Sequence, residues 1–248
     1  MEHKKKNSCR VDVTLPGRSY FKGTLHPLSR SINMLTDILI NEGFRLIDAP
    51  EIDSEWYNFT ALNITKNHPA RALADTFYIC DSPFLLRTHT SNAQIRSMQN
   101  NFPPMKIFSI GRVYRRDFDS THSPMFHQLE ILVVNKTANI VQLKHHVHKI
   151  LCSFFLTEFP IRFRTSYFPF TEPSFEVDIL CNKNLSKGCE EYWLEILGCG
   201  MVNDKVFKNV GIINTLNRGF ALGVGIERLV MLKHGINDIR DLYNGSLS

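Results

Sequence analysis

Charged and amide side chains gather between Gly111 and Glu130, a composition suited to binding a charged substrate. The pattern predicts two strands joined by a long polar loop. Because side chains alternate along a strand, Arg115 and Asp117 are predicted on one face of the first strand, and Gln128 and Glu130 on one face of the second. A solvated hairpin with surface ion pairs is the alternative. The apolar run directly after Glu130 argues against it, because that run takes the second strand into a core.

A second cluster combines glycines with an arginine. Gly223 and Gly225 alternate along a predicted strand, and Arg228 falls in the first turn of the helix predicted to follow. The spacing differs from the GxGxxG fingerprint of dinucleotide-binding folds. Glycines on one strand face leave bare backbone on which a flat group can lie, and an arginine beside free N–H groups at a helix start can bind a polyphosphate. Glycines in strands also mark bulges and tight packing, so that alternative stays open.

Two further segments carry aromatic or hydrogen-bonding side chains. Phe168 and Phe170 flank a proline, where they either pack in the core or form the walls of a pocket for an aromatic ring. Residues 86–94 concentrate polar side chains just before a predicted helix. Some of these polar residues are alternatively helix N-caps: Thr88, Thr90 and Ser91.

Histidines and cysteines give no clear metal or disulfide pattern. His145, His146 and His148 lie on a predicted helix without a carboxylate or cysteine at ligand spacing, so we interpret them as a solvated face. The six cysteines form no CxxC pair and show no regular spacing. Reduced thiols are therefore expected.

The elements that must position these residues follow from hydrophobic spacing and turn residues. An amphipathic helix is predicted to start at Pro27 and to end before Gly43. Further helices are predicted at 91–100, 140–158 and 226–234. Strands are predicted at 11–15, 44–47, 76–80, 106–115, 126–134, 161–167, 175–180, 192–201 and 220–224. These elements predict an α+β fold with a large, mostly antiparallel sheet flanked by helices, in one domain at 11–248 after a disordered basic tail at 1–10.

The composition is that of a globular protein with a mildly basic surface. The chain has 248 residues, 43% of them apolar, and a net charge of +5, which would favour a polyanionic partner. No stretch approaches about 18 consecutive apolar residues, and the basic run Lys4–Lys6 is not followed by an apolar signal segment. We therefore expect a cytoplasmic protein without a membrane partner.

Taken in order, these segments resemble the signature of class II aminoacyl-tRNA synthetases, and the residues between them resemble the alpha subunits of bacterial-type phenylalanyl-tRNA synthetases. Residues 43–50, 113–130 and 223–228 look like motifs 1, 2 and 3 of the class. The subfamily resemblance is carried by six segments: NFTALN at 58–63, HPAR at 68–71, LRTHT at 86–90, FHQLE at 126–130, YFPFTEP at 167–173 and GCGM at 198–201. The similarity extends from about Arg10 to Tyr243.

The resemblance implies the class II catalytic fold, ligase activity and a site for ATP with Mg²⁺. The ATP-binding residues would be Arg115, Asp117, Phe126, Gly223, Gly225 and Arg228. Arg115 would bind the α-phosphate and Arg228 the γ-phosphate, which makes them the two catalytic residues. No general base is implied, because the nucleophile is an amino-acid carboxylate that is already ionised.

The resemblance also implies a phenylalanine site, with transfer of the activated amino acid to tRNA(Phe). The residues around the ammonium and carboxylate groups would be His89, Ser91, Gln94, Gln128 and Glu130, and those around the ring Phe168, Phe170 and Ala221. Ala221 would limit the depth of the pocket at the para position. Glu172 is a candidate metal ligand at a subunit interface.

A partner chain is also expected from the resemblance. An apolar pocket rejects an added hydroxyl by only about a hundredfold, so tyrosine would sometimes be activated. The chain is too short for a second, editing site. In the family a beta subunit performs the editing, and it pairs with alpha through motif 1 in a heterotetramer.

The chain departs from the family pattern at its start. Family members usually begin with a long helical arm that grips tRNA, whereas nine residues precede Arg10 here, so we expect adenylate formation to persist and tRNA affinity to be weakened. Two rival hypotheses are a non-catalytic paralog with a binding or regulatory role, and a synthetase-like ligase for an acceptor other than tRNA. Paralogs usually lose the phosphate-binding arginines, and both arginines are present here.

Overall fold

A computed structural model describes residues 14, 23–185, 188–213 and 216–244, with the side chains of 182–190 left out of the description. The predicted tail at 1–10 and, apart from Thr14, the strand predicted at 11–15 lie outside the described residues.

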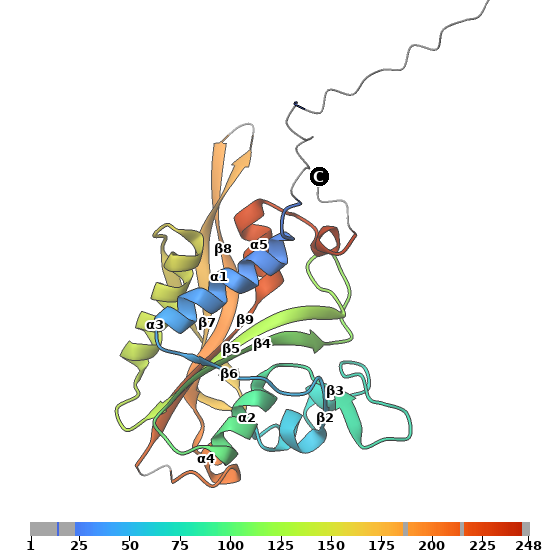
Figure 1. Ribbon diagram of the computed structural model, residues 1–248, viewed down its shortest axis with the longest axis vertical. Helices are drawn as coiled ribbons and strands as arrows, with labels where there is room; N and C mark the ends of the chain where they lie inside the picture. Colours follow the sequence, from blue (N-terminus) through green and yellow to red (C-terminus); the bar gives the residue numbers. More distant parts are fainter. Residues whose placement is uncertain (1–13, 15–22, 186–187, 214–215, 245–248) are drawn as a thin grey trace, which may run out of the picture.

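The described chain is built around a seven-stranded sheet (Figure 1). The strand order is β1 (Arg45–Leu46), β4 (Met105–Tyr114), β5 (Met125–Asn135), β9 (Arg218–Gly225), β8 (Gly188–Val202), β7 (Thr171–Leu185) and β6 (Ile161–Phe168). β1 pairs with β4 in parallel, and every other neighbouring pair in this sheet is antiparallel. The prediction of an α+β fold with a mostly antiparallel sheet is confirmed.

Alternation along the central strands gives the sheet two different faces. Leu129, Ile131 and Val133 of β5 pack into one large apolar core together with three helices: α1 (Pro27–Asn41), α3 (Ile140–Phe155) and α5 (Ile226–His234). Leu132 and Val134 point the other way, into a smaller core with α2 (Ser91–Asn100) and α4 (Asp204–Asn209). In Figure 1, α1, α3 and α5 accordingly lie together, while α2 and α4 lie apart from them. Gln128 and Glu130 of β5 share the face of the smaller core.

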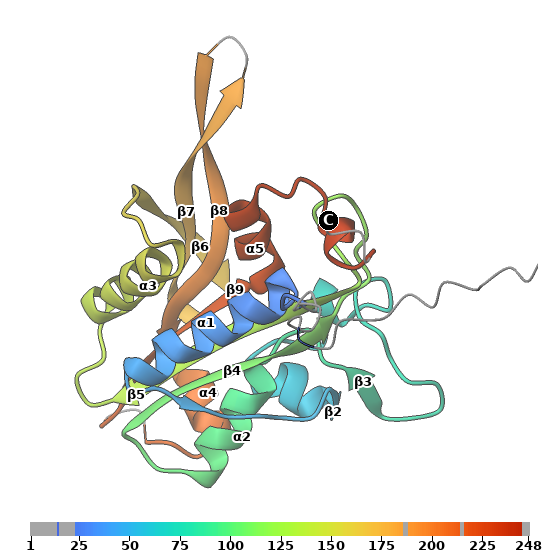
Figure 2. The same ribbon diagram turned by 45° about the horizontal axis from the view of Figure 1, so that its top comes forward.

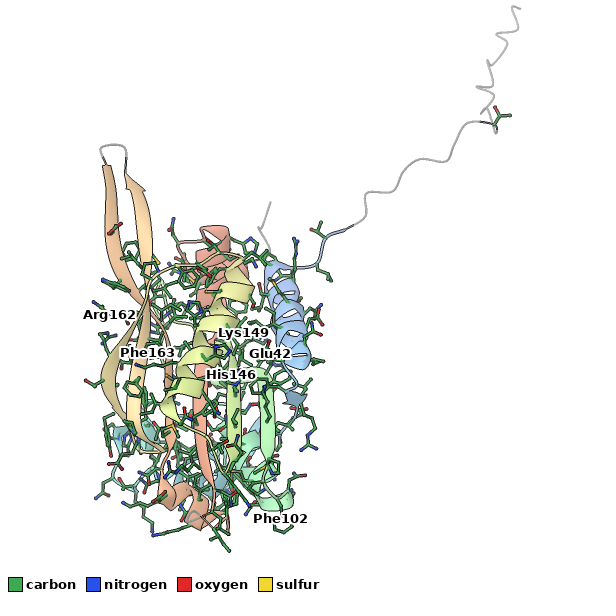
Figure 3. The ribbon with its side chains drawn as sticks, turned by 90° about the vertical axis from the view of Figure 1, so that its left-hand side faces the viewer. Glu42, Phe102, His146, Lys149, Arg162 and Phe163 are labelled. Atoms are coloured by element: carbon green, nitrogen blue, oxygen red, sulfur yellow. The ribbon has the colours of Figure 1, made fainter. Side chains whose placement is uncertain are left out.

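Helix α1 forms as its end signals predict. Pro27 is its first residue, and the His26 ring accepts a hydrogen bond from the Leu28 backbone N–H at 3.2 Å. After the helix, Gly43 adopts a φ of +79°, a conformation that costs glycine little. The helix is joined to α3 by an ion pair of 2.6 Å between Lys149 and Glu42, which Figure 3 shows beside His146.

The histidine prediction for α3 is confirmed in part. His145 and His148 are exposed. His146 is half-buried, and its ring packs against Phe44 at 5.4 Å and Phe220 at 5.7 Å. It therefore belongs to the contact between α3 and the sheet, because helical periodicity turns it toward the same side as Leu143 and Val147.

Several predicted boundaries differ from the structure. α3 ends at Phe155 instead of residue 158, because Leu156 takes a left-handed conformation with φ of 59°. The strand predicted at 76–80 is wrong: this stretch makes only an isolated bridge, between Tyr78 and Leu85. β7 and β8 extend beyond their predicted ends and form a long hairpin that projects from the body (Figure 2).

Short elements escaped prediction. β2 (Ile52–Ser54) and β3 (Phe84–Leu86) pair antiparallel in a separate two-stranded sheet. Also missed were α4, the π-helical turn η1 (Trp56–Thr60), and the 3-10 turns η2 (Pro69–Arg71) and η3 (Ile239–Leu242). None of these is long enough to complete a hydrophobic period. Within the described residues, no helix is both long and apolar enough to cross a membrane.

Candidate functional site

A cavity of about 880 Å³ lies on the polar face of the sheet, bordered by β5, β8, β9, the start of α2 and the turn between β6 and β7. It is lined by every residue predicted to bind ATP or the amino acid: Arg115, Asp117, Phe126, Gly223, Gly225, Arg228, His89, Ser91, Gln94, Gln128, Glu130, Phe168, Phe170 and Ala221. Residues from opposite ends of the chain therefore share one surface.

The floor of the cavity is set by strand register. Glu130 of β5 lies opposite Gly223 of β9, which in turn lies opposite Gly198 of β8. Directly opposed residues on neighbouring strands point to the same face of the sheet, so at Gly223 and Gly198 no side chain stands on that face. A β-carbon at Gly223 would stand 3.2 Å from Gln128 Nε2 and 3.3 Å from Glu130 Cγ. The missing side chain thus allows the two polar side chains of β5 to lie close to β9, which supports the interpretation that Gly223 marks tight packing.

Glu130 is a buried carboxylate held by the first turn of α2. Its Oε2 accepts hydrogen bonds from Ser91 Oγ at 2.6 Å and Gln94 Nε2 at 3.0 Å. Ser91 and Gln94 are three residues apart, so they share one helix face. Burial raises the pKa of Glu130 to about 7, against the lowering effects of the Ser91 hydrogen bond and the Arg115 charge. The N-cap alternative is not seen for Ser91, because its hydroxyl is used on Glu130.

The two arginines approach the cavity from different elements. Arg115 lies just after β4, donates from Nε to the Thr88 carbonyl at 2.9 Å, and stacks over the Phe126 ring at 5.2 Å. Arg228 lies in the first turn of α5 and donates from Nη1 to the Glu195 carbonyl at 3.1 Å. The prediction that Arg115 and Asp117 belong to a strand is wrong, because β4 ends at Tyr114. The side chains of Arg115 and Asp117 nevertheless line the cavity.

Two aromatic rings form the apolar end of the cavity. The rings of Phe168 and Phe170 stack at 5.8 Å with an angle of 10° between their planes. A β-carbon at Gly198 would stand 2.9 Å from the Phe168 ring, so the absence of a side chain at Gly198 leaves the space that the ring occupies. Asn63 Nδ2 donates to the Pro169 carbonyl at 2.6 Å and so holds the turn between the two rings. Ala221 borders the same end.

His89 faces the cavity with unused hydrogen-bonding capacity. Its side chain is buried, and neither ring nitrogen has a hydrogen-bond partner among the described residues. Burial, helped by the nearby Arg115 charge, lowers the pKa of His89 to about 3. The imidazole is therefore neutral, with one donor and one acceptor nitrogen available to a ligand.

Asn58 and Glu227 are buried polar residues that the site analysis of the sequence missed. Asn58 exchanges two hydrogen bonds with Thr88, donating to its hydroxyl at 3.0 Å and accepting from its backbone N–H at 3.1 Å. Glu227 accepts from the His127 backbone at 2.8 Å and from the Tyr243 hydroxyl at 2.6 Å. The available signal was that Glu227 stands next to Arg228 in the segment 223–228, and that Asn58 begins the segment 58–63.

The predicted metal ligand Glu172 lies outside the cavity lining, and its Oε2 accepts from Asn203 Nδ2 at 3.1 Å. Among the described residues, the ligand atoms of Asp117, Asp119 and His122 lie within 4.8 Å of one another, and all three residues are exposed. Asp117 also lines the cavity, two residues after Arg115, whereas Glu195 contacts Arg228 through its backbone carbonyl and its carboxylate lies 3.5 Å from Arg164. Mg²⁺ prefers such oxygen ligands together with substrate phosphates and water, so the donor set fits this cation.

Comparisons with known proteins agree with this arrangement. The chain matches the family described as tRNA synthetases class II core domain (F) over residues 10–248. It is 49% identical over 238 residues to the phenylalanine–tRNA ligase alpha subunit of Xylella fastidiosa strain 9a5c, covering 96% of this chain and 70% of that protein. The alpha subunit of Haemophilus influenzae strain PittEE is 50% identical over 238 residues, with the same coverage. That of Cellvibrio japonicus is 48% identical over 241 residues, covering 96% of this chain and 71% of that protein.

These matches span nearly the whole chain, and residues of the segments 113–130 and 223–228 line one cavity. The chain belongs to the class II aminoacyl-tRNA synthetases, in the phenylalanine–tRNA ligase alpha-subunit family.

Proposed function

We propose that the chain is the catalytic subunit of a phenylalanine–tRNA ligase, which activates phenylalanine with ATP and transfers it to tRNA(Phe). One observation carries the proposal: a single cavity combines two arginines, a buried carboxylate and a stacked pair of phenylalanine rings. These groups are complementary to a polyphosphate, an ammonium group and an aromatic side chain, respectively. The names of the similar alpha subunits support the same assignment.

In the activation step, the phenylalanine carboxylate attacks the α-phosphorus of ATP. A bond forms between a carboxylate oxygen and that phosphorus, the bond to the bridging oxygen breaks, and pyrophosphate leaves with the electron pair. Arg115 stabilises the charge that develops at the α-phosphate, and Arg228 holds the γ-phosphate. Mg²⁺ would supply neutralisation of phosphate charge, and the carboxylate of Asp117, which lines the cavity two residues after Arg115, would hold it. Phe126, stacked by Arg115, and the strand at Gly223 and Gly225 flank the adenosine.

Phenylalanine is recognised at both of its ends. The Glu130 carboxylate accepts from the substrate ammonium, while His89, Ser91, Gln94 and Gln128 supply the remaining hydrogen bonds to the ammonium and carboxylate groups. Phe168 and Phe170 hold the ring, and Ala221 limits the depth at the para position. The stacked geometry of the two rings supports this role, because aromatic side chains favour offset-stacked and edge contacts.

We further assign a cytoplasmic setting and a beta subunit as partner, in a heterotetramer. The name "alpha subunit" of the relatives and the exposed apolar side chains near the β1 edge support this assignment: Ile40 is 52% exposed and Leu46 50% exposed. A metal-binding role for Glu172 at a subunit interface stays part of the proposal, away from the β1 edge, since Glu172 lies in β7.

Phenylalanine-dependent ATP–pyrophosphate exchange tests the function, using the chain co-expressed with the beta subunit. Arg228→Ala is expected to reduce kcat/KM by about a hundredfold or more, because it removes a charge-assisted contact to the triphosphate. Arg218→Ala, at the far end of β9, is the matched control and is expected to keep normal exchange. Exchange that depends on another amino acid, or that is unchanged in Arg228→Ala, would overturn the assignment.

Charging of tRNA(Phe) separates the rival functions. Non-catalytic paralogs usually lose the phosphate-binding arginines, whereas here both Arg115 and Arg228 line the cavity. Normal exchange without any tRNA charging would favour a ligase for another acceptor.

A further inference from the structure

Arg87 is a buried arginine whose contacts are carbonyl oxygens. Only 3% of the Arg87 surface is exposed. Nε donates to the Arg112 carbonyl at 2.8 Å and Nη1 to the Ala49 carbonyl at 2.8 Å. Within the described part of the chain, its guanidinium forms no ion pair. A guanidinium stays charged even when burial lowers its pKa, so placing it here has a desolvation cost that a merely space-filling residue would avoid.

Glycine at position 111 makes room for this guanidinium. A β-carbon on Gly111 would stand 2.1 Å from Arg87 Nη2, far closer than any real contact allows. Gly111 lies opposite Gln128 in the β4–β5 register, so it points to the sheet face that carries Gln128 and Glu130. The Arg87 head group therefore lies on β4, on the sheet face that carries Gln128 and Glu130, where it lines a second pocket with Ala49 and Gly111 and not the main cavity.

The backbone of Arg87 is also fixed on both sides. Its N–H donates to the Glu51 carbonyl at 2.8 Å, and its carbonyl accepts from the Tyr114 N–H at 2.9 Å. The next residue, Thr88, supplies the carbonyl that holds Arg115. His89 and Ser91 follow within four positions, and both face the cavity.

We propose that Arg87 is a positioning residue of the amino-acid site, which fixes the substrate-facing segment 88–91 against β4 and the segment 48–51. The inference deepens the proposed function and rests on it. An arginine suits the task because its planar fork donates in two fixed directions at once, to Arg112 and to Ala49. A lysine would keep the charge but would offer only a single, freely rotating head group.

The consequence reaches Glu130 by two routes. Displacing the segment moves Ser91, which bonds directly to the carboxylate. Removing the guanidinium also removes one of the positive charges that act on Glu130, the other being Arg115. The His89 imidazole beside them is neutral. β9 and α5, which carry Gly225 and Arg228, make no hydrogen bond or ion pair with Arg87 among the described contacts, so ATP binding is expected to change least.

The test measures phenylalanine-dependent exchange by the chain with its beta subunit, from pH 6 to pH 9. Arg87→Lys and Gly111→Ala are each expected to raise the KM for phenylalanine about tenfold or more and to lower kcat, with little change in the KM for ATP. Arg87→Ala should also move the acidic limb of kcat/KM for phenylalanine to higher pH, by about half a unit or more, whereas Arg87→Lys should not. A structural role alone would leave that limb in place.

Two comparisons make the result specific. Arg112→Ala removes an exposed arginine that also contacts residue 51, through the Glu51 carboxylate at 3.0 Å, and is expected to keep normal KM and pH dependence. Adding Gly111→Ala to Arg87→Ala should cause little further loss, because the added β-carbon clashes only with the guanidinium. Melting temperatures show which variants fold. If Arg87→Ala does not fold, Arg87→Lys and Gly111→Ala decide the question.

The two proposals fail in different ways. A wild-type enzyme without phenylalanine-dependent exchange would remove the proposed function and this inference with it. An active wild type whose folded Arg87→Lys and Gly111→Ala variants keep their KM values would overturn the positioning role alone.

Discussion

Glu130 and the residues around it set the chemistry of the site at the residue scale. A carboxylate buried beside Ser91 and Gln94, with a pKa raised to about 7, is only partly ionised near neutral pH. A substrate ammonium would favour the ionised form and satisfy the buried charge. Under the proposed function, the burial of Glu130 therefore makes the binding of a cationic group sensitive to pH.

We predict that the KM for phenylalanine falls about tenfold between about pH 6 and pH 8. The reason is that the ionised fraction of Glu130 rises through this pH window, so that the carboxylate changes from the minor form to the major form. The kinetics of phenylalanine-dependent ATP–pyrophosphate exchange across this pH range measure the KM directly. In Glu130→Gln the KM should be high and nearly independent of pH. A slope that persists in this variant would assign the titration to another group.

Ala221 permits a test of pocket depth. It borders the cavity together with Phe170 and Leu132, on the same strand face as Gly223. Ala221→Gly removes one methyl group, so para-chlorophenylalanine should be activated at least about tenfold better relative to phenylalanine. Ala70→Gly, at another position in the cavity lining, serves as the control. An unchanged preference in Ala221→Gly would place the para position elsewhere.

At the element scale, the site depends on links between turns that are far apart in the chain. Asn63, which has a φ of 60°, follows η1, and it donates to the turn between β6 and β7 through Pro169. Asn58, inside η1, holds Thr88 just before α2. Through these amides a short helical turn supports both the ring end and the ammonium end of the cavity.

We predict that Asn63→Asp raises the KM for phenylalanine about fivefold and weakens rejection of tyrosine, because the aromatic turn loses its donor. Aspartate has nearly the same size and tolerates a positive φ, so the loss of free energy of unfolding should stay within about 1–3 kcal/mol. ATP–pyrophosphate exchange with phenylalanine and with tyrosine measures the KM and the rejection of tyrosine. Urea unfolding measures the loss of free energy of unfolding. Asn209→Asp, which removes donors to Thr60 and Ala61 on the same element, provides a comparison. If Asn63→Asp and Asn209→Asp reject tyrosine equally well, the idea that Asn63 positions the two rings is contradicted.

At the scale of the whole molecule, the sheet separates stability from catalysis. One face packs against α1, α3 and α5 in a continuous apolar core, while the other carries the cavity. The sheet ends at β1, a strand of only two residues whose Leu46 is exposed. A short, unpaired edge beside exposed apolar side chains is a suitable surface for another chain.

We predict that Leu46→Asp abolishes co-purification of the beta subunit while the chain itself stays folded, because a charge would be buried on association. Affinity pull-down and circular dichroism measure the two outcomes. Val141→Asp replaces an apolar residue of α3 that is 77% exposed and is expected to leave association intact. Retained binding in Leu46→Asp would move the interface away from this edge.

Most of the long elements were predictable from the sequence, and every residue predicted to bind ATP or the amino acid lines the cavity, but Glu227, which also lines it, was missed. Periodicity located α1, α2, α5 and the central strands, and the alternation of β5 placed Gln128 and Glu130 opposite the large core. Short elements such as β2, β3 and α4 were missed, and residues 76–80 were misassigned as a strand. Such segments are too short to show a period, so tertiary contacts decide their conformation.

The sequence by itself determined which residue types stand on which face of each long element, and therefore the family and the chemistry of the site. Only the tertiary structure decided which of them touch. Arg87 meets Arg112 across 25 positions, Asn63 meets Pro169 across 106, and Glu227 meets His127 across 100. Hydrophobic spacing reports the orientation of a side chain within its own element. The partner it meets depends on how the elements pack and on where a glycine such as Gly111 leaves space.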